Sequence, residues 1–167
     1  MAKERVMPFG AAIVTVSDGV SHGTREDRSG DAAHRLLSEH DFEVVERTVV
    51  PDDREAIQAA LRRVVDVEVP LLVTTGGTGF GPRDVTPEAT GAVIERAAPG
   101  LAEVMRAAGL AKTPLAALSR AVAGAAGRTL IVNLPGNPKG MEESLEAVLP
   151  LIPHALQLLA GDTEHDA

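Results

Sequence analysis

Four short apolar segments, each the length of one buried strand and rich in β-branched residues, recur along the chain and alternate with longer stretches of helical periodicity. They span residues 9–16, 42–50, 70–75 and 129–134. Strands that alternate with helices in this way favour a parallel or mostly parallel sheet that carries helices on both faces. The sequence therefore predicts an α/β fold of three layers, with ligands at the carboxyl ends of the strands.

The stretches between these strands carry helix-start signals, because a Ser, Thr, Asp or Asn cap precedes apolar residues at helical spacing. The predicted helices are residues 30–40 capped by Ser29, a helix that starts at Asp52 with Glu55 in capping-box spacing, residues 86–97 capped by Thr86, residues 101–108, and residues 141–160 broken at Pro150 and Pro153. Residues 118–132 contain two apolar runs divided by Gly124 and Gly127, which fit either a hairpin or a strand and a crossover.

The length of 167 residues fits one domain over residues 1–167, with a short N-terminal extension, 1–8, and a polar tail, 161–167. The chain contains no cysteine, so thiolate catalysis, iron–sulfur clusters and disulfides are excluded, and a reducing compartment is compatible. Its start carries acidic and basic residues ahead of only a short apolar run, so neither a signal peptide nor a membrane span is predicted. We expect a soluble, cytoplasmic protein.

Acidic residues outnumber basic ones by 24 to 16, which gives a formal net charge of -8, and the aromatic residues are three phenylalanines. A nucleic-acid surface needs a basic patch, and single-stranded nucleic acid is bound by aromatic side chains that stack on its bases. The composition provides neither, so we predict no nucleic-acid partner. A small anionic ligand remains compatible, because backbone amides and a few cations make a pocket locally positive.

A glycine-rich segment, residues 74–88, follows the third strand and leads directly into a helix. Glycines let backbone amides approach a bound anion closely, and the helix N-terminus adds unpaired N–H groups. The segment matches neither common nucleotide motif, because Pro82 stands where the Rossmann fingerprint has its third glycine and no Gly-Lys-Ser/Thr follows. A tight turn without a ligand is the alternative, but Arg83 and Asp84 beside the helix start favour a phosphate-binding loop.

Two aspartates at the same edge of the predicted sheet are the candidate catalytic and metal-binding residues. Asp84 stands beside the predicted phosphate loop, where a carboxylate would repel the phosphate unless a Mg²⁺ lay between them. Asp52 follows the second strand and either faces Asp84 across that metal or acts only as the cap of the next helix. Both interpretations of Asp52 remain open at this point.

Three further polar segments are predicted to join the same site. Residues 17–30 form a first loop that is long for a strand-to-helix connection, which favours a function for it. Ser119 and Arg120 precede the glycine-broken runs, where Arg120 is either a solvated charge or part of the site. Residues 135–139 read Pro-Gly-Asn-Pro-Lys, a helix start with Asn137 as its cap that also suits an anion.

These motifs together resemble the molybdopterin adenylyltransferases, which comprise the Mog-type and MoaB-like bacterial proteins and the equivalent domain of fusion proteins such as gephyrin. The likeness runs in one order over nearly all of residues 9–162 and is weakest in the alanine-rich segment 97–117. The motifs that carry it are residues 17–23, 26–30, 50–52, 74–90, 118–120 and 133–138. The resemblance implies a compact α/β domain of the molybdopterin-binding type that assembles as a homotrimer.

The resemblance also implies an activity in molybdenum cofactor biosynthesis. The terminal phosphate of molybdopterin would attack the α-phosphorus of ATP in the presence of Mg²⁺, giving adenylylated molybdopterin and pyrophosphate. A molybdenum insertase is a candidate downstream partner, and no membrane partner is expected. A non-catalytic molybdopterin-binding or scaffold protein of the same fold is the alternative, against which the presence of both Asp52 and Asp84 argues.

Carried over residue by residue, the resemblance implies three groups of site residues. The essential carboxylates, which would also hold the metal, are Asp52 and Asp84. The ATP and phosphate side comprises Thr75, Gly76, Gly77, Thr78, Gly79 and Arg83, together with Ser17, Asp27 and Gly30 from the first loop. The molybdopterin side comprises Ser119, Arg120, Pro135, Gly136, Asn137, Pro138 and Lys139. The sequence thus predicts one composite site at one edge of the sheet.

Overall fold

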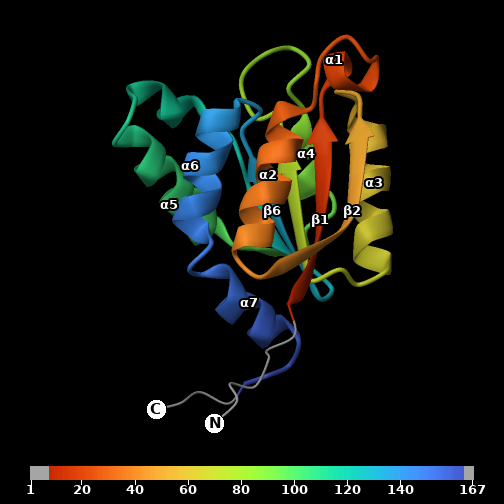
Figure 1. Cartoon of the computed structure of the whole chain (residues 1–167), viewed down its shortest axis with the longest axis vertical. Coiled ribbons are helices and arrows are strands. Elements are labelled where there is room, and N and C mark those ends of the chain that lie inside the picture. Colours follow the sequence, from red (N-terminus) through yellow and green to blue (C-terminus); the bar gives the residue numbers. More distant parts are fainter. Residues whose placement is uncertain (1–7, 164–167) are drawn as a thin grey trace.

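A six-stranded sheet forms the centre of the computed structural model, which describes residues 8–163 (Figure 1). The strands are β1 Phe9–Val16, β2 Phe42–Val50, β3 Leu71–Thr75, β4 Arg96–Ala97, β5 Ala123–Ala126 and β6 Thr129–Leu134. Their order across the sheet is β2-β1-β3-β6-β5-β4. The first four strands pair in parallel, whereas β5 pairs antiparallel with β6 and β4 pairs antiparallel with β5. The predicted mostly parallel sheet is therefore confirmed. Of the predicted extension and tail, residues 1–7 and 164–167 lie outside the described part.

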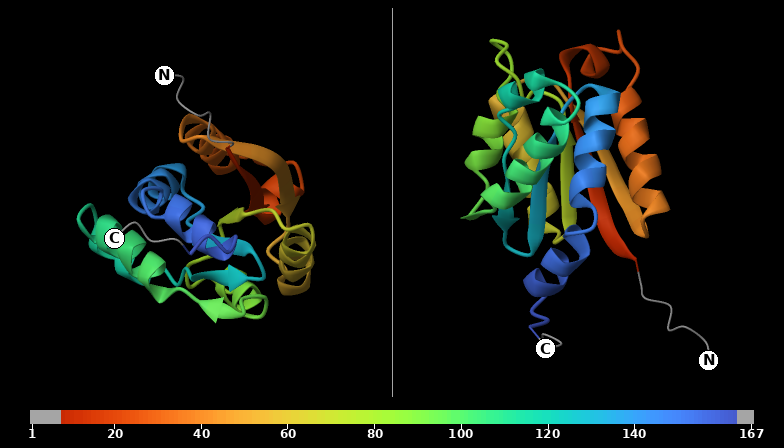
Figure 2. Two further views of the ribbon diagram at one scale, coloured as in Figure 1. Left: turned by 90° about the horizontal axis from the view of Figure 1, so that it is seen from below. Right: turned by 90° about the vertical axis from the view of Figure 1, so that its left-hand side faces the viewer.

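Helices cover both faces of the sheet, as Figure 2 shows. They are α1 Asp18–Ser21, α2 Arg28–Glu39, α3 Arg54–Asp66, α4 Thr86–Gly91, α5 Pro99–Leu110, the 3₁₀ helix η1 Pro114–Leu118, α6 Pro138–Val148 and α7 Ile152–Leu159. Buried side chains of α2, α5, α6 and α7 form one core with the sheet, and those of α3 and α4 form another on the opposite face. The result is the three-layer α/β architecture that the sequence predicts. Within residues 8–163 no helix is long and apolar enough to span a bilayer.

The alternation of side chains along each central strand divides the core between the two faces. Ile13 and Val73 point to the core under α2 and α6, whereas Val14 and Leu72 point to the core under α3. All four side chains are essentially inaccessible to solvent. Because burial of one such side chain contributes about 1.5–3 kcal/mol, continuous apolar runs are what a strand needs when both of its faces are covered.

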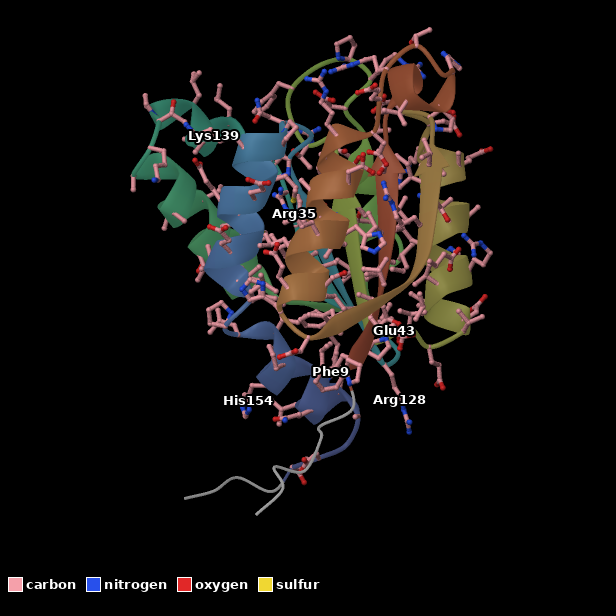
Figure 3. The ribbon with its side chains drawn as sticks, viewed as in Figure 1. Phe9, Arg35, Glu43, Arg128, Lys139 and His154 are labelled. Carbon is pink, nitrogen blue, oxygen red and sulfur yellow. The ribbon has the colours of Figure 1, made fainter. Side chains whose placement is uncertain are left out.

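The topology places a crevice at the carboxyl ends of β1 and β3. From β1 the chain runs to β2 on one side and then returns to β3 on the other side, so the strand order reverses between β1 and β3. Ligands of open α/β sheets bind at such a switch point. Lys139 marks this end of the molecule in Figure 3, whereas Phe9, Arg128 and His154 lie at the opposite end.

The start of α2 differs from the prediction. Asp27, and not Ser29, is its N-cap, because the Asp27 carboxylate accepts a hydrogen bond from the Gly30 N–H at 3.0 Å. The Ser29 side chain is buried, and its hydroxyl donates to Thr75 Oγ1 at 3.3 Å. Serine and aspartate are equally good caps, so local sequence alone does not decide between two candidates two positions apart.

The prediction for α4 was also wrong at both ends. Its N-cap is Val85, and the buried Thr86 hydroxyl instead donates to the Gly76 carbonyl at 2.9 Å. The helix ends at Gly91, before the short edge strand β4, and does not reach residue 97. Thr86 therefore ties the helix to the glycine-rich loop that precedes it.

The structure also shows how residues 118–132 fold and where the C-terminal helix is broken. β5 and β6 are antiparallel neighbours joined at Gly127, whose φ of +55° suits a tight turn, so the hairpin alternative for residues 118–132 is confirmed. The C-terminal helix is broken where the prolines predict it, because α6 ends at Val148 and α7 begins at Ile152.

Candidate active site

A pocket of about 890 Å³ opens at the carboxyl ends of β1 and β3 and contains both predicted carboxylates, Asp52 and Asp84. We call it the carboxylate pocket. Of the residues predicted to bind ATP or phosphate, those that line it are Thr75, Gly76, Gly77, Ser17 and Asp27, and from the molybdopterin side Gly136, Asn137 and Pro138 reach it. The structure thus brings together segments that lie more than a hundred residues apart in the sequence.

The glycine-rich loop fits against the end of β1 because Gly76 has no side chain. Gly76 has a φ of +97°, and a Cβ there would lie 2.3 Å from the Val16 carbonyl oxygen. Gly136 approaches it from the other side, where an added Cβ would lie 3.1 Å from the Gly76 Cα. The Gly76 N–H donates to the Leu134 carbonyl at 3.0 Å. The turns after β1, β3 and β6 therefore pack backbone against backbone.

Asp52 is held by a reciprocal exchange of hydrogen bonds with Asp18. The Asp18 N–H donates to Asp52 Oδ2 at 2.9 Å, and the Asp52 N–H donates to Asp18 Oδ1 at 3.0 Å. The helix cap is the adjacent Asp53, whose carboxylate accepts from the Ala56 N–H at 2.9 Å. The interpretation of Asp52 as an N-cap is therefore wrong, and Asp52 lines the carboxylate pocket instead.

Partial burial and the neighbouring carboxylates oppose the ionisation of Asp52. Partial burial, followed by the neighbouring carboxylates of Asp18 and Asp84, raises the pKa of Asp52 above its usual value, although the Asp18 N–H acts in the other direction. Asp18 behaves oppositely, because its hydrogen bonds with the Arg83 guanidinium lower its pKa. Arg83 Nε and Nη2 contact the two Asp18 oxygens at 2.5 Å and 3.0 Å. A cation placed at Asp52 would relieve this crowding of negative charge.

Asp84 enters the pocket from a turn that its own carboxylate closes. Asp84 Oδ2 accepts from the Gly81 N–H at 2.8 Å, and the Asp84 N–H donates to the Gly81 carbonyl at 3.0 Å. Within residues 8–163 no three metal-binding side chains of the His, Cys, Asp or Glu type come together. Asp52 and Asp84 still fit Mg²⁺, since this ion is commonly held by one or two carboxylates together with substrate phosphates and water.

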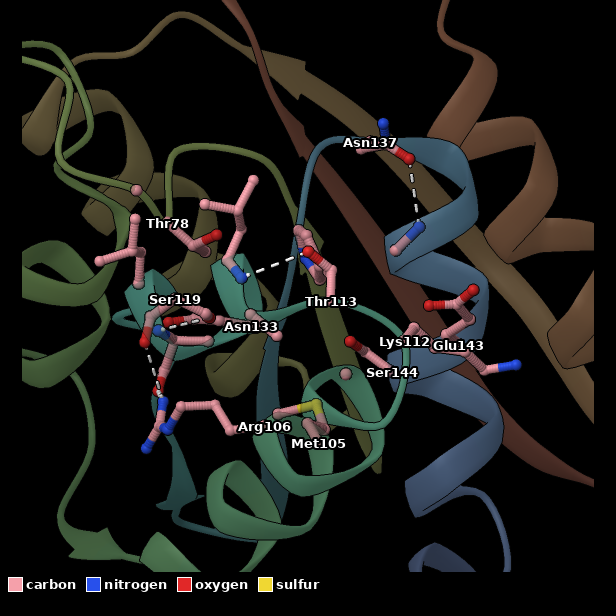
Figure 4. A pocket seen from close by; sticks show the side chains of 18 of the residues that line it. Thr78, Met105, Arg106, Lys112, Thr113, Ser119, Asn133, Asn137, Glu143 and Ser144 are labelled. Carbon is pink, nitrogen blue, oxygen red and sulfur yellow. Dashed lines mark hydrogen bonds between the residues drawn. The ribbon is translucent and has the colours of Figure 1, made fainter.

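A second pocket, of about 510 Å³, lies between α5, η1 and α6 (Figure 4). We call it the α5–α6 pocket. Apolar side chains that include Ala102, Met105 and Leu118 line it, and the cations Lys112 and Lys139 belong to its lining as well. Of the residues predicted for the molybdopterin side, it contains Ser119, Pro135, Asn137 and Lys139; Thr78 and Gly79 of the glycine loop also line it. Asn137 lines both pockets, so its loop forms part of the wall between them.

Three predicted residues have their polar groups directed at protein partners. The Gly30 N–H is bound to Asp27, and Arg83 is paired with Asp18. The Arg120 guanidinium holds the loop that carries Asp84, where its Nη2 donates to the Asp84 carbonyl at 2.8 Å. In this structure Gly30, Arg83 and Arg120 therefore contribute to the site by holding other residues in place.

Sequence reasoning did not single out several residues that line or support the pockets. Arg106 and Met105 come from the alanine-rich α5, which offers no motif. Asn133 is fully buried, and its amide donates at 3.0 Å to Thr74 Oγ1 and Thr90 Oγ1. A polar residue inside an otherwise apolar strand is the signal that marks Asn133, because a buried amide needs such partners.

Known proteins share this fold and this arrangement of segments. A family model described as a probable molybdopterin binding domain matches residues 12–154. The chain belongs to this family. Its molybdopterin-binding domain is similar to the molybdopterin adenylyltransferase of Helicobacter pylori, with 43% identity over 153 residues that cover 90% of this chain and 87% of the relative.

Other relatives belong to two named groups of this family. The molybdopterin adenylyltransferase of Escherichia coli is 38% identical and is matched over 84% of its length by 89% of this chain. The crystal structure of the molybdopterin biosynthesis enzyme MoaB from Thermus thermophilus is 54% identical, with a TM-score of 0.87 over 92% of this chain and 97% of that one. Both groups therefore support a role in molybdenum cofactor biosynthesis.

The two adjacent aspartates of this molybdopterin-binding chain should respond oppositely to substitution. Asp53→Ala removes a helix cap and should cost about 1 kcal/mol of unfolding free energy. Asp52→Asn keeps an acceptor for the Asp18 N–H and removes a charge whose pKa is raised, so it should leave stability at pH 7 unchanged or higher.

The stability of Asp52→Asn should depend on pH. An ionised Asp52 opposes folding, so any gain in Asp52→Asn should shrink as the pH falls through the raised folded-state pKa and vanish below the pKa of the unfolded chain. Thermal unfolding without added metal, followed from pH 7 downward, measures both variants. A larger loss of stability in Asp52→Asn than in Asp53→Ala at pH 7 would contradict the assignment.

Proposed function

We propose that the chain is a molybdopterin adenylyltransferase that transfers AMP from ATP to the terminal phosphate of molybdopterin. The observation that carries this proposal is a pair of dissimilar pockets divided by one wall. One pocket holds two carboxylates and a glycine-rich loop, and the other is lined by apolar side chains and lysines. A reaction that joins a nucleotide to a phosphorylated heterocycle needs two such pockets side by side.

The chemistry of each pocket supports one substrate. The ATP phosphates suit the carboxylate pocket, where the loop of Gly76 and Gly77 offers close backbone approach and Asp52 and Asp84 offer ligands for Mg²⁺. The pterin suits the α5–α6 pocket, where Met105 and Leu118 offer apolar surface and Lys139 a positive charge for its phosphate. The pterin phosphate would then reach the α-phosphorus at the loop of Asn137.

The reaction needs alignment more than covalent help from the protein. An oxygen of the pterin phosphate forms a bond to the α-phosphorus, the bond from that phosphorus to its bridging oxygen breaks, and pyrophosphate leaves with the electron pair. Bound by Asp52 and Asp84, Mg²⁺ would offset the charge of the phosphates. The backbone of the glycine loop would orient the chain of phosphates, and Lys139 would orient the attacking one.

Incubation with molybdopterin, Mg²⁺ and ATP labelled in its α-phosphate tests the proposal. Label should move to the pterin in the unaltered chain. In Asp84→Asn, transfer should fall at least about 100-fold, because loss of a metal-bound charge removes several kcal/mol of transition-state stabilisation. Binding of molybdopterin alone should persist, since Asp84 lines the other pocket. Asp52→Asn should behave in the same way.

The same experiment separates the alternative. A chain that binds molybdopterin but transfers no label, under conditions in which a known molybdopterin adenylyltransferase does, would be a pterin-binding or scaffold protein. Near-normal turnover in Asp84→Asn would leave the enzyme assignment intact and refute the metal-binding role.

We further propose a homotrimer, which the family likeness supports. Val104 and Leu110 of α5 are exposed and lie outside the lining of the α5–α6 pocket, so they provide apolar surface that association would cover. Sedimentation equilibrium at micromolar concentration should give three times the mass of one chain. A single species with the mass of one chain would refute the trimer.

A further inference from the structure

We propose that Arg120 is a positioning residue for Asp84, and that it acts by holding the loop of residues 79–88 and not by contact with the pterin. The inference rests on the proposed adenylyl transfer. It assigns to Arg120 a role different from the one that the sequence resemblance implies.

The Arg120 guanidinium spans the loop from end to end. Its Nε donates to the Gly79 carbonyl at 2.7 Å, its Nη2 donates to the Asp84 carbonyl at 2.8 Å, and its Nη1 pairs with the Glu88 carboxylate. The guanidinium carbon also lies 5.4 Å from the centroid of the Phe80 ring. One planar side chain thus fixes the start of the loop, the main chain at Asp84, and the first turn of α4.

The tip of the loop, residues 80–83, has few other contacts with the rest of the protein. Phe80 is 71% exposed, and Gly81, Pro82 and Arg83 are exposed as well. A second tie lies on the opposite side, where Arg83 pairs with Asp18. The C-terminal end of the loop is anchored by the buried Thr86 and by Val85, which packs against the core. Residues 80–83 lack buried side chains, so we infer that the two arginines position the loop that carries Asp84. The hydrogen bond from Arg120 also lowers the pKa of Glu88, which keeps that partner ionised.

The main chain on either side of Arg120 belongs to the other pocket. Ser119 and Ala121 line the α5–α6 pocket, and the Arg106 guanidinium holds their carbonyls at 3.2 Å and 3.0 Å. The Arg120 N–H donates to the Thr78 carbonyl at 2.9 Å. The main chain of Arg120 therefore belongs to the wall of the proposed pterin pocket, and its side chain holds the loop of the proposed nucleotide pocket by hydrogen bonds. Its side chain thus connects the two proposed substrate sites through hydrogen bonds.

Steady-state transfer of labelled AMP and pterin binding in the absence of ATP separate the two roles. Pterin fluorescence reports binding cleanly, because the chain contains no Trp or Tyr. Arg120→Ala should lower kcat by about 10-fold to 100-fold, the scale of a misplacement near 1 Å, and leave the Kd of molybdopterin unchanged. Arg120→Lys should recover only part of the loss, since an ammonium cannot span three acceptors.

Two further variants sharpen the result. Glu88→Gln removes one loop partner and leaves Arg120 in place, so it should lower kcat in the same direction but less. Arg35→Ala removes another exposed Arg–Glu pair, with Glu142, and serves as the matched control with both quantities unchanged. A weaker Kd for molybdopterin with kcat intact in Arg120→Ala would make Arg120 a direct ligand and overturn the inference. So would unchanged values of both.

Hydrogen exchange keeps the inference testable if the unaltered chain transfers no AMP, a result that would refute the proposed function alone. Amide exchange in residues 79–88 should be faster in Arg120→Lys and in Glu88→Gln than in the unaltered chain, while residues 135–140 exchange as before. Unchanged exchange in residues 79–88 would overturn the positioning role.

Discussion

Close backbone packing among three strand ends is the constraint on which the site depends. Gly76 lies against the Val16 carbonyl on one side, at a distance that excludes a side chain, and against Gly136 on the other, where an added Cβ would make a tight contact. The segments after β3 and β6 each line both pockets, so this contact helps to form the wall between the carboxylate pocket and the α5–α6 pocket. A parallel sheet whose strand order reverses between β1 and β3 makes the approach geometrically available.

Negative charge is concentrated on one side of that wall, which disfavours the ionised form of Asp52 in the protein without a bound cation. Asp18 and Asp52 exchange backbone hydrogen bonds, and Arg83 neutralises Asp18 but not Asp52. Partial burial raises the pKa of Asp52, and the neighbouring carboxylates of Asp18 and Asp84 add to this effect. Sites that bind a cation commonly retain such uncompensated carboxylates, because the energy of crowding is released when the cation binds. The neighbouring Asp53 carries out the helix-capping task, which leaves Asp52 to the site.

Much of the fold could be predicted from the sequence, because continuous apolar runs and helix caps are local signals. The parallel strands, the hairpin at Gly127 and the break between α6 and α7 follow from them. Caps were assigned less well, since Ser29 and Thr86 form tertiary hydrogen bonds to Thr75 and Gly76 that no local pattern reveals. The pairing of Asp52 with Asp18 and the grip of Arg120 on the Asp84 loop depend on residues over 30 positions apart. The alanine-rich α5 gave no sign that it lines a pocket.

The central claim is that the two pockets hold the two halves of one product across the wall at Asn137. A crystal structure of the chain with adenylylated molybdopterin tests this most directly. We expect the adenylate phosphate beside Asp52 and Asp84 and the pterin between α5 and α6, with the phosphate bridge at the loop of Asn137. A product with both halves in a single pocket, or with the pterin against the two aspartates, would contradict it.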